Sequence, residues 1–233
     1  MAADVTKTIV FDAVGTLIYP DPEVAAVYTQ IGERFGSRLK AEEVAARFRA
    51  VFHEVEARDR AGDLRTSEEF EYRRWQEIVS RVLDDVTDRA SCFAELYGHF
   101  ARATAWRVFA DVGPAFDELG SRGVSLVVAS NFDERFLGIA SQLPALRLCR
   151  HVLVSSRVGW RKPHPQFFRA VLETVGTGPE GVLYVGDDLE NDVDGPRSVG
   201  LPAVQLIRRG PLRDGAIRSL KELLNPRSDY ADY

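Results

Sequence analysis

Short apolar runs that alternate with helical stretches constrain the fold of this chain more than any other feature. Each run is rich in Val, Leu and Ile, the composition of strands that are buried on both faces of a parallel sheet. The runs fall at 8–11, 124–130, 152–155, 182–185 and 203–207. Helical patterns lie among the later runs, at 114–119, 134–141, 166–175 and 192–199. This order predicts βαβ units with right-handed crossovers, and therefore an α/β fold built on a parallel sheet.

Residues 19–106 differ in character from the rest of the chain. They hold no strand-like run and show amphipathic helical stretches at 24–35, 42–58, 67–83 and 89–102. Thr66-Ser67-Glu68-Glu69 resembles an N-terminal capping signal, and Gly62 would end the helix before it. The aromatic residues here recur mostly at helical spacing, which favours core packing over ligand stacking. We predict an all-helical cap domain over 19–106, inserted into a core domain formed by 1–18 and 107–233.

The composition is that of an ordinary globular protein. With 233 residues, 45% of them hydrophobic and 28% charged, the chain can bury a core without disulfides or structural metals. Cys92 and Cys149 lack metal-ligand or redox spacing and are interpreted as reduced thiols. The net charge of -5 and the lack of a long basic run argue against a nucleic-acid-binding surface. The short Arg208-Arg209 pair is expected to be solvated.

The sequence also bears on location and partners. No apolar run approaches the length that spans a bilayer, and residues 1–4 lack the basic and apolar segments of a signal peptide. We therefore expect a cytoplasmic protein that acts on a small molecule, with no membrane or nucleic-acid partner. The oligomeric state stays open at this stage.

Polar side chains stand where three of the predicted strands end. Asp12 follows the first run, Ser130 ends the second, and Asp187 follows 182–185 through Gly186. Because ligands bind at the carboxyl ends of parallel strands, these residues should converge on one edge of the sheet. Each has an ordinary explanation when taken alone, as a turn or a helix cap. Their common placement at strand ends predicts a functional site.

The acids at this edge suggest carboxylate and metal chemistry. Asp12 is the candidate nucleophile, since a carboxylate can attack phosphorus or activated carbon and form a covalent intermediate. Asp187, Asp188 and Asp192 would repel one another unless a cation neutralises them, and Mg²⁺ prefers such oxygen ligands. Asp12 and Asp187 would be direct ligands, with either Asp188 or Asp192 beside them. The alternative is that Asp188 and Asp192 merely favour the N-terminal end of a helix through its dipole.

Two further motifs would complete a phosphate site. Ser130 and Asn131 offer a hydroxyl and nearby backbone N–H groups to a phosphoryl oxygen. Lys162, which precedes Pro163, would place an ammonium beside Asp12 and the substrate oxygens and offset the charge of several acids.

Taken together, these motifs resemble the haloacid dehalogenase-like hydrolase superfamily. The resemblance covers nearly the whole chain and rests on four segments: 11–17, Ser130-Asn131, Lys162-Pro163, and Gly186-Asp187-Asp188 with Asp192. It implies a Rossmann-like core with a helical cap inserted after the first motif. It also implies that Mg²⁺ binds the backbone carbonyl of Val14 in addition to the acids.

Val14 departs from the pattern of the phosphatases in this superfamily. They carry a second aspartate at this position, which protonates the departing alcohol and then deprotonates the attacking water. Val14 can do neither, and general acid–base catalysis is worth roughly 10²–10⁴-fold, so weak activity on alkyl phosphates is expected. A cap residue could supply the proton instead; the candidates are His53, Glu54, Glu56 and His99.

Three functions remain in competition. The first is a Mg²⁺-dependent phosphohydrolase that acts on a small phosphorylated metabolite through an aspartyl-phosphate on Asp12. The second is a metal-independent 2-haloacid dehalogenase, because those enzymes also lack the second aspartate and a halide needs no proton to leave. The third is a non-catalytic member that binds a phosphorylated ligand or a protein partner.

Overall fold

The computed structural model describes residues 7–225, so the residues behind the signal-peptide expectation, 1–4, lie outside the described part. Its centre is a parallel sheet of five strands in the order β5-β4-β1-β6-β7. The strands are β1 (Thr8–Phe11), β4 (Ser125–Ser130), β5 (His151–Val154), β6 (Val182–Gly186) and β7 (Ala203–Gln205). Each predicted run has become one of these strands, which confirms the α/β class and the Rossmann-like parallel sheet.

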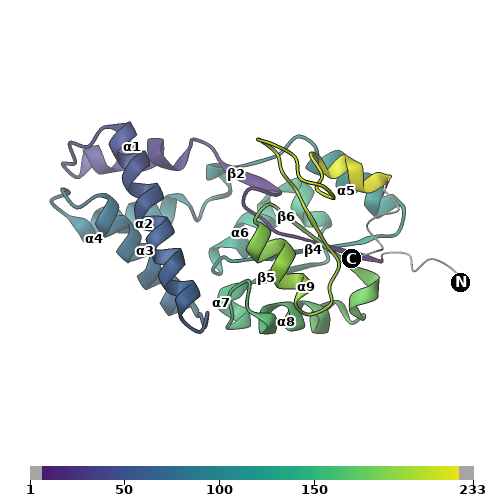
Figure 1. The fold of residues 1–233 in the computed structure, drawn as a ribbon. Helices are drawn as coiled ribbons and strands as arrows, with labels where there is room; N and C mark the ends of the chain where they lie inside the picture. The colour runs from purple at the N-terminus through teal and green to yellow at the C-terminus, as the bar shows by residue number, and fades with distance from the viewer. Residues whose placement is uncertain (1–6, 226–233) are drawn as a thin grey trace, which may run out of the picture.

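Helices cover both faces of the sheet (Figure 1). Side chains alternate between the faces, so Phe11 of β1 contacts Phe116 of α5 (Val112–Ser121), with ring centroids 4.9 Å apart. Two further elements pack on this face: α6 (Arg135–Gln142) and η5 (Leu220–Leu224). On the other face Tyr184 of β6 meets Phe168 of α8 (Pro165–Val175), and the short α9 (Gly195–Arg197) lies beside α8. The result is a three-layer, doubly wound core.

The strand order reverses beside β1. From β1 the chain continues to β4 and β5 on one side of the sheet, and β6 and β7 lie on the other side. In open α/β sheets, ligands bind in the crevice outside the carboxyl ends of strands at such a switch point. Asp12 follows β1 and Asp187 follows β6, so both acids stand at this crevice.

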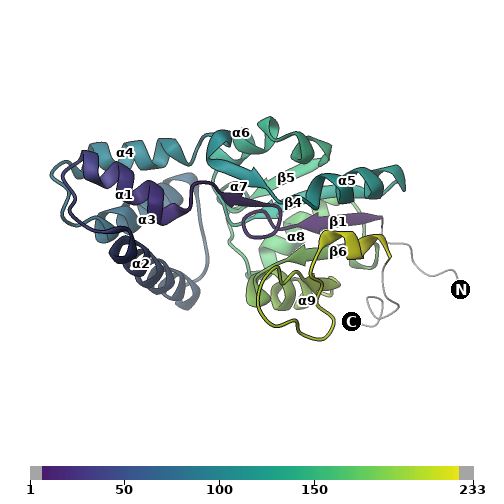
Figure 2. The ribbon, with the colours of Figure 1, turned by 90° about the horizontal axis from the view of Figure 1, so that it is seen from above.

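Four helices form a second packed body, here called the helical unit: α1 (Val24–Arg34), α2 (Ala41–Ala61), α3 (Glu68–Val82) and α4 (Arg89–His99). Its hydrophobic cluster includes Tyr28, Val44, Ile78 and Phe93, separate from the clusters on the sheet. Figures 1 and 2 show this unit to one side of the sheet. The predicted caps are confirmed, because the Ser67 side chain accepts a hydrogen bond from the Phe70 backbone and α2 ends before Gly62.

Several short elements were not predicted. The helical unit is joined to the sheet by a two-stranded antiparallel ribbon of β2 (Ile18–Pro20) and β3 (Trp106–Val108). Three residues are too few for a periodic signal, so sequence patterns miss such strands. The predicted helix over 192–199 starts earlier, as the π-helical η4 (Glu190–Asp194), and continues into α9. The remaining short elements are η1 (Ala103–Ala105), η2 (Pro144–Leu148), α7 (Ser155–Val158) and η3 (Pro179–Gly181).

Two sequence expectations are met in the described residues. Cys92 and Cys149 are free cysteines, as interpreted from their spacing. Within residues 7–225, every helix is too short or too polar to cross a bilayer.

Candidate functional site

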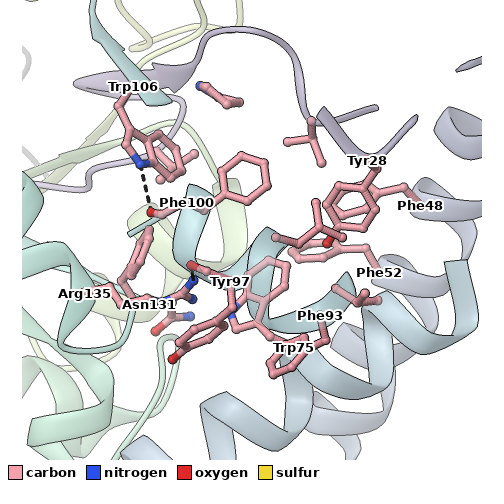
Figure 3. Close-up of a pocket in the computed structure, with 16 residues that line it drawn as sticks. Tyr28, Phe48, Phe52, Trp75, Phe93, Tyr97, Phe100, Trp106, Asn131 and Arg135 are labelled. Carbon is pink, nitrogen blue, oxygen red and sulfur yellow. Dashed lines mark hydrogen bonds between the residues drawn. The ribbon is translucent and has the colours of Figure 1, made fainter. Parts of the chain in front are cut away.

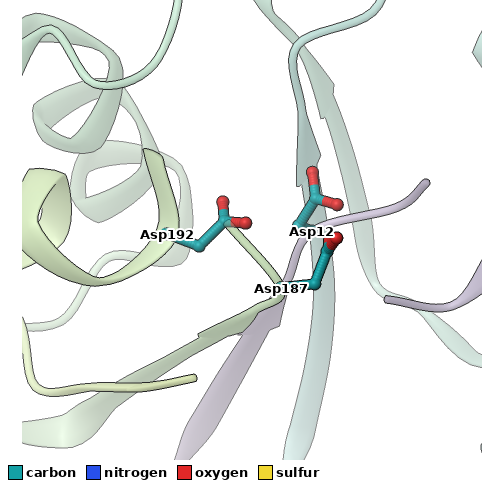
Figure 4. Close-up of side chains that lie close together, drawn as sticks. All are labelled: Asp12, Asp187 and Asp192. Carbon is teal, nitrogen blue, oxygen red and sulfur yellow. The ribbon is translucent and has the colours of Figure 1, made fainter. Parts of the chain in front are cut away.

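Three carboxylates meet at the switch point. Asp12, Asp187 and Asp192 each place an oxygen within 4.8 Å of the others. Figure 4 shows the three side chains close together, with Asp12 after β1, Asp187 after β6 and Asp192 in η4. The backbone N–H of Asp12 donates to the carbonyl of Val185 at 2.9 Å, which extends the pairing of β1 with β6 to the acid itself. Asp12 and Asp192 are buried, whereas Asp187 keeps an exposed surface.

Two glycines allow the loops that carry these acids to approach closely. Gly15 has φ +92°, and a Cβ added there would lie 2.4 Å from an oxygen of Asp187. A Cβ on Gly186 would lie 2.3 Å from the carboxyl carbon of Asp192. Thr16 then donates its hydroxyl to Asp187 Oδ1 at 3.0 Å. Glycine at 15 is therefore required both by the backbone conformation and by the acid beside it.

Lys162 bridges two of the acids. Its Nζ donates to Asp12 Oδ1 at 2.7 Å and to Asp192 Oδ1 at 2.6 Å, and its side chain is buried. Burial opposes the charged form, but the charges of Asp12 and Asp192 outweigh it and raise the pKa of Lys162 well above its usual value. Lys162 is therefore a permanently charged ammonium that is hydrogen-bonded to the candidate nucleophile, Asp12.

Asn131 holds the backbone that carries this lysine. Its side-chain NH₂ donates to the carbonyl of Lys162 at 3.0 Å, and its side-chain oxygen accepts from the N–H of Lys162 at 2.8 Å. Ser130 is buried at the end of β4 immediately before it. The structure thus brings Ser130, Asn131, Lys162 and Asp12 together, with Asn131 engaged in positioning Lys162.

The acid group carries more negative charge than one lysine can balance. Desolvation raises the pKa of Asp187 to about 6 even though part of its surface is exposed, and the charge of Asp12 adds to this effect. Burial raises the pKa of Asp192 to about 7; Lys162 acts against this rise and Asp12 reinforces it. An oxygen-only donor set with excess negative charge and one acid open to solvent fits a hard divalent cation such as Mg²⁺.

Asp188 does not belong to this group. It is exposed, and its Oδ1 accepts a hydrogen bond from the backbone N–H of Asn191 at 2.8 Å. Its own backbone N–H donates to Asp192 Oδ2 at 3.1 Å. The sequence analysis left Asp188 and Asp192 as alternative partners of Asp12 and Asp187. In the structure Asp192 lies beside these two acids.

Arg208 contradicts the expectation of a solvated pair. Its side chain is largely buried; Nη2 donates to the carbonyl of Thr16 at 2.6 Å, and Nη1 pairs with Asp111 at 3.0 Å. Arg208, in the segment after β7, therefore holds the loop after Asp12 in place through the carbonyl of Thr16. No local pattern could have shown this, because Asp111 and Thr16 lie far from Arg208 in sequence.

A cavity of about 260 Å³ lies beside the loop after β1, where Val14 lines it (Figure 3). Aromatic side chains of the helical unit line one side of it: Tyr28, Phe48, Phe52, Trp75, Phe93 and Tyr97. Val14, Trp106 and Phe132 also line the cavity, from outside the four helices. The expectation that the aromatic residues serve mainly as core is thus incomplete, because most of those in the helical unit also line this cavity.

Val14 is part of the cavity wall and is 38% exposed. The four candidate proton donors lie elsewhere. Glu54 pairs with Arg81, Glu56 with Arg74 and Arg161, and His99 with Arg102, while His53 is exposed. Among the described residues, the lining contains no carboxylate and no histidine.

A carboxylate paired with a buried lysine at the switch point of a doubly wound sheet is an arrangement suited to a hydrolase with a Rossmann-like core. The comparisons agree with this class. A model of the haloacid dehalogenase-like hydrolase family matches residues 6–200, and the chain belongs to this family.

Two curated relatives illustrate the similarity. The human haloacid dehalogenase-like hydrolase domain-containing protein 3 is 32% identical over 132 residues, which cover 54% of this chain and 53% of that protein. Phosphatase MT3486 of Mycobacterium tuberculosis (strain CDC 1551 / Oshkosh) is 33% identical over 118 residues, covering 49% of this chain and 54% of that protein. The chain thus matches about half the length of these two relatives.

Solved structures share the fold. A haloacid dehalogenase-family phosphatase from Thermococcus onnurineus superposes with a TM-score of 0.65 at 24% identity, covering 93% of this chain and 95% of that one. An L-2-haloacid dehalogenase from Xanthobacter autotrophicus superposes with a TM-score of 0.73 at 17% identity, covering 94% and 97%. At these identities the likeness concerns the fold alone.

Proposed function

We propose that the chain is a Mg²⁺-dependent phosphohydrolase that acts on a small phosphorylated metabolite through an aspartyl-phosphate on Asp12. The observation that carries the proposal is the pairing of Asp12 Oδ1 with Lys162 Nζ at 2.7 Å, beside two further acids. Lys162 binds Oδ1, which leaves Oδ2 for attack on phosphorus. The similarity to a protein named as a phosphatase also supports this choice.

In this mechanism Asp12 Oδ2 forms a bond to phosphorus while the bond from phosphorus to the leaving oxygen breaks, and the electron pair departs with that oxygen. The Lys162 ammonium offsets charge on the phosphoryl oxygens. Ser130 ends the neighbouring strand β4 and offers its hydroxyl to one of those oxygens. The oxygen of a water molecule then bonds to phosphorus while the bond from phosphorus to Asp12 Oδ2 breaks. This step releases inorganic phosphate, passes a proton of the water to solvent and restores the Asp12 carboxylate.

Asp12, Asp187 and Asp192, with the backbone carbonyl of Val14 that the family pattern implies, would hold the Mg²⁺. When bound, the ion would neutralise the charge of the phosphoryl group and of the acids. The chain's own residues supply the nucleophile and the ammonium.

The helical unit has the position of a cap. We assign it to residues 19–106 and the core to 1–18 and 107–233, joined through the β2–β3 ribbon. A cap that closes over the crevice excludes water from the aspartyl-phosphate until the leaving group has gone.

Phosphate release with Mg²⁺ tests the proposal, with acetyl phosphate and an aryl phosphate as substrates and Asp12→Asn as the blank. Native protein should release phosphate from both substrates above the blank. On an alkyl phosphate assayed as a third substrate, Val14→Asp should increase the rate of phosphate release by roughly 10²–10⁴-fold, because it restores the missing acid. Equal release by the native and Asp12→Asn proteins would refute the assignment.

Val14 and the apolar cavity favour one second candidate, hydrolysis of a carbon–halogen bond. A halide departs without a proton, so an apolar residue at position 14 does not slow that reaction. Halide release from a 2-haloacid by protein treated with a chelator would support this function over the first. Binding of phosphate or Mg²⁺ without turnover of either substrate class would instead indicate a non-catalytic member.

A further inference from the structure

We propose that the group esterified to phosphate in the substrate is an uncharged aromatic alcohol, a phenol or naphthol, and that its ring occupies the cavity between the helical unit and the loop after β1. This inference rests on the phosphohydrolase function proposed above and names its substrate class.

The cavity borders two residues that stand next to those that would perform the chemistry. Val14 and Asn131 both line it. Val14 is two residues beyond Asp12 in the same loop, and Asn131 holds the backbone of Lys162. A phosphoryl group bound beside the Asp12–Lys162 pair would therefore have this cavity within reach of its ester substituent.

The volume suits a ring larger than benzene. An apolar cavity of about 150 Å³ is large enough to bind benzene. The present cavity is about 260 Å³, which accommodates a substituted phenyl ring or two fused rings.

The lining favours an aromatic occupant over an aliphatic one. Phe48 and Phe52 are stacked with centroids 5.7 Å apart, Tyr28 meets Phe48 edge-to-face at 5.3 Å, and Phe52 lies 6.2 Å from Trp75. In Figure 3 these side chains of the helical unit face Trp106 and Arg135 across the cavity. A ring inserted here gains offset or edge-to-face contacts worth about 0.5–1.5 kcal/mol each beyond its buried area.

The cavity offers no unpaired charge to a substrate. Arg135 is the one cation that lines it among the described residues, and its Nε and Nη2 donate to both oxygens of buried Asp133 at 2.8 and 2.7 Å. Its guanidinium also lies 3.6 Å from the centre of the Tyr97 ring. A carboxylate or sulfonate on the substrate would lose its hydration without gaining a free cation, so the aromatic group should be neutral.

Val14 points to the same substrate class by an independent route. Without an acid at position 14, the leaving oxygen departs as an anion. A phenolate delocalises this charge into its ring, whereas an alkoxide cannot. In the balanced step, Asp12 bonds to phosphorus, the bond from phosphorus to the aryl oxygen breaks, and the phenolate takes a proton from water after release.

Kinetics on three phosphate esters, with acetyl phosphate as a reference substrate, test the proposal. The native protein would be assayed with Mg²⁺ on 2-naphthyl phosphate, its 6-sulfonate, cyclohexyl phosphate and acetyl phosphate. We expect kcat/KM for 2-naphthyl phosphate to exceed that for the sulfonate by about tenfold or more, the factor that corresponds to about 1.4 kcal/mol. Equal values for these two esters would overturn the inference.

Two substitutions on one helix separate the cavity from general effects. Trp75→Leu removes a ring from the lining, whereas Tyr72→Leu removes a more exposed ring of α3 that does not line the cavity. The ratio of kcat/KM for 2-naphthyl phosphate to that for acetyl phosphate should fall about tenfold in Trp75→Leu and stay unchanged in Tyr72→Leu. Phe48→Leu serves as a second lining variant, and an unchanged ratio in both lining variants would contradict the proposal.

A binding measurement requires neither metal nor turnover. Calorimetry should show that 2-naphthol binds to Asp12→Asn protein. Adding Trp75→Leu to this protein should weaken the binding, and cyclohexanol should bind more weakly than 2-naphthol. If acetyl phosphate is hydrolysed but the aromatic ester is not preferred, only the substrate class is wrong. If no phosphate is released from any of the four substrates, both the proposed function and the substrate class fail, whether or not 2-naphthol binds.

Discussion

Arg161 donates a hydrogen bond to Glu71 at 2.5 Å, joining the residue immediately before Lys162 to helix α3 of the helical unit. A second bond at 2.7 Å runs from Arg161 to Glu56 of α2, and Arg74 pairs with Glu56 and with Asp59. The backbone N–H of Arg161 also donates to the carbonyl of Leu64 at 2.9 Å. The segment that carries the candidate catalytic lysine is thus attached to the helical unit by a buried network of charges.

Glu71→Gln should lower the free energy of unfolding by about 3–5 kcal/mol. The reason is that Glu71 is only 2% exposed, so its replacement leaves the buried Arg161 guanidinium with Glu56, a carboxylate that Arg161 shares with Arg74. Urea denaturation measures the change. The matched control is Glu69→Gln on the same helix, whose ion pair with Arg73 is exposed and worth no more than about 1 kcal/mol. Similar losses in the two variants would contradict this account of the network.

Lys162→Met should reduce kcat for phosphate release by about 10²–10³-fold, the range observed when one preorganised donor is removed from an active site. The substitution keeps most of the apolar stem but leaves Asp12 and Asp192 without their ammonium partner. Steady-state kinetics on acetyl phosphate would measure it. Lys221→Met, at an exposed lysine of η5, should leave kcat unchanged. Retained activity in Lys162→Met would exclude Lys162 from catalysis.

Gly15→Ala and Gly123→Ala separate backbone strain from a local clash. Both glycines have positive φ, +92° and +81°, so alanine at either position should destabilise the fold by about 1–2 kcal/mol. At Gly123 no atom lies within 4 Å of the new methyl, whereas at Gly15 it would displace Asp187. We therefore expect Gly15→Ala alone to lose Mg²⁺ binding and phosphate release. Thermal unfolding and phosphate assays on both variants check this, and an active Gly15→Ala protein would contradict it.

Asp111→Asn should produce a loss of stability that depends on pH. Burial opposes ionisation of Asp111, but hydrogen bonds from the Leu220 N–H and the Ser219 hydroxyl, together with Arg208, outweigh it and hold its pKa below the ordinary 3.8. A carboxyl whose pKa is lower in the folded state stabilises the fold above the unfolded pKa, and the effect disappears as the pH falls through the folded pKa.

The gap in unfolding free energy between native protein and Asp111→Asn should accordingly be about 1–2 kcal/mol at pH 7 and should narrow steadily below about pH 4. Urea denaturation over a series of pH values measures it. Asp117→Asn, at an exposed position of the same helix α5, should show no such dependence. A gap that stays constant with pH would mean that the charge of Asp111 does not hold the C-terminal segment.

The strands and the acids at their ends could be predicted because both signals are local. A run such as 182–185 is apolar at every position, and Asp187 follows it after one glycine. The β2–β3 ribbon could not be predicted, because its strands are short and pair Ile18 with Val108 across the whole helical unit. The pairing of β1 with both β4 and β6 likewise depends on long-range contacts that no window of sequence contains.

The candidate site shows the same division. Asp12 and Lys162 were recognised from their motifs, whereas the pairing of Arg161 with Glu71 and of Arg208 with Asp111 joins residues that are distant in sequence and have no motif. The choice between Asp188 and Asp192 depended on where η4 begins. Because Asp188 turns outward to accept from Asn191, the acid one helical turn later meets Asp12 instead.

Removal of one acid from the carboxylate group should abolish stabilisation by Mg²⁺. A ligand at 100 times its Kd stabilises the folded state by about 2.7 kcal/mol, so saturating Mg²⁺ should raise the Tm of the native protein measurably. Asp187→Asn removes one of the three grouped carboxylates and should eliminate this rise, together with phosphate release. Asp188→Asn makes the same chemical change one residue away, at an exposed acid outside the group, and should keep the rise. Because the shift in Tm is measured without substrate, it tests the cation site separately from catalysis. An equal response to Mg²⁺ in the two variants would mean that the three acids do not form the binding site and that Lys162 alone balances Asp12 and Asp192.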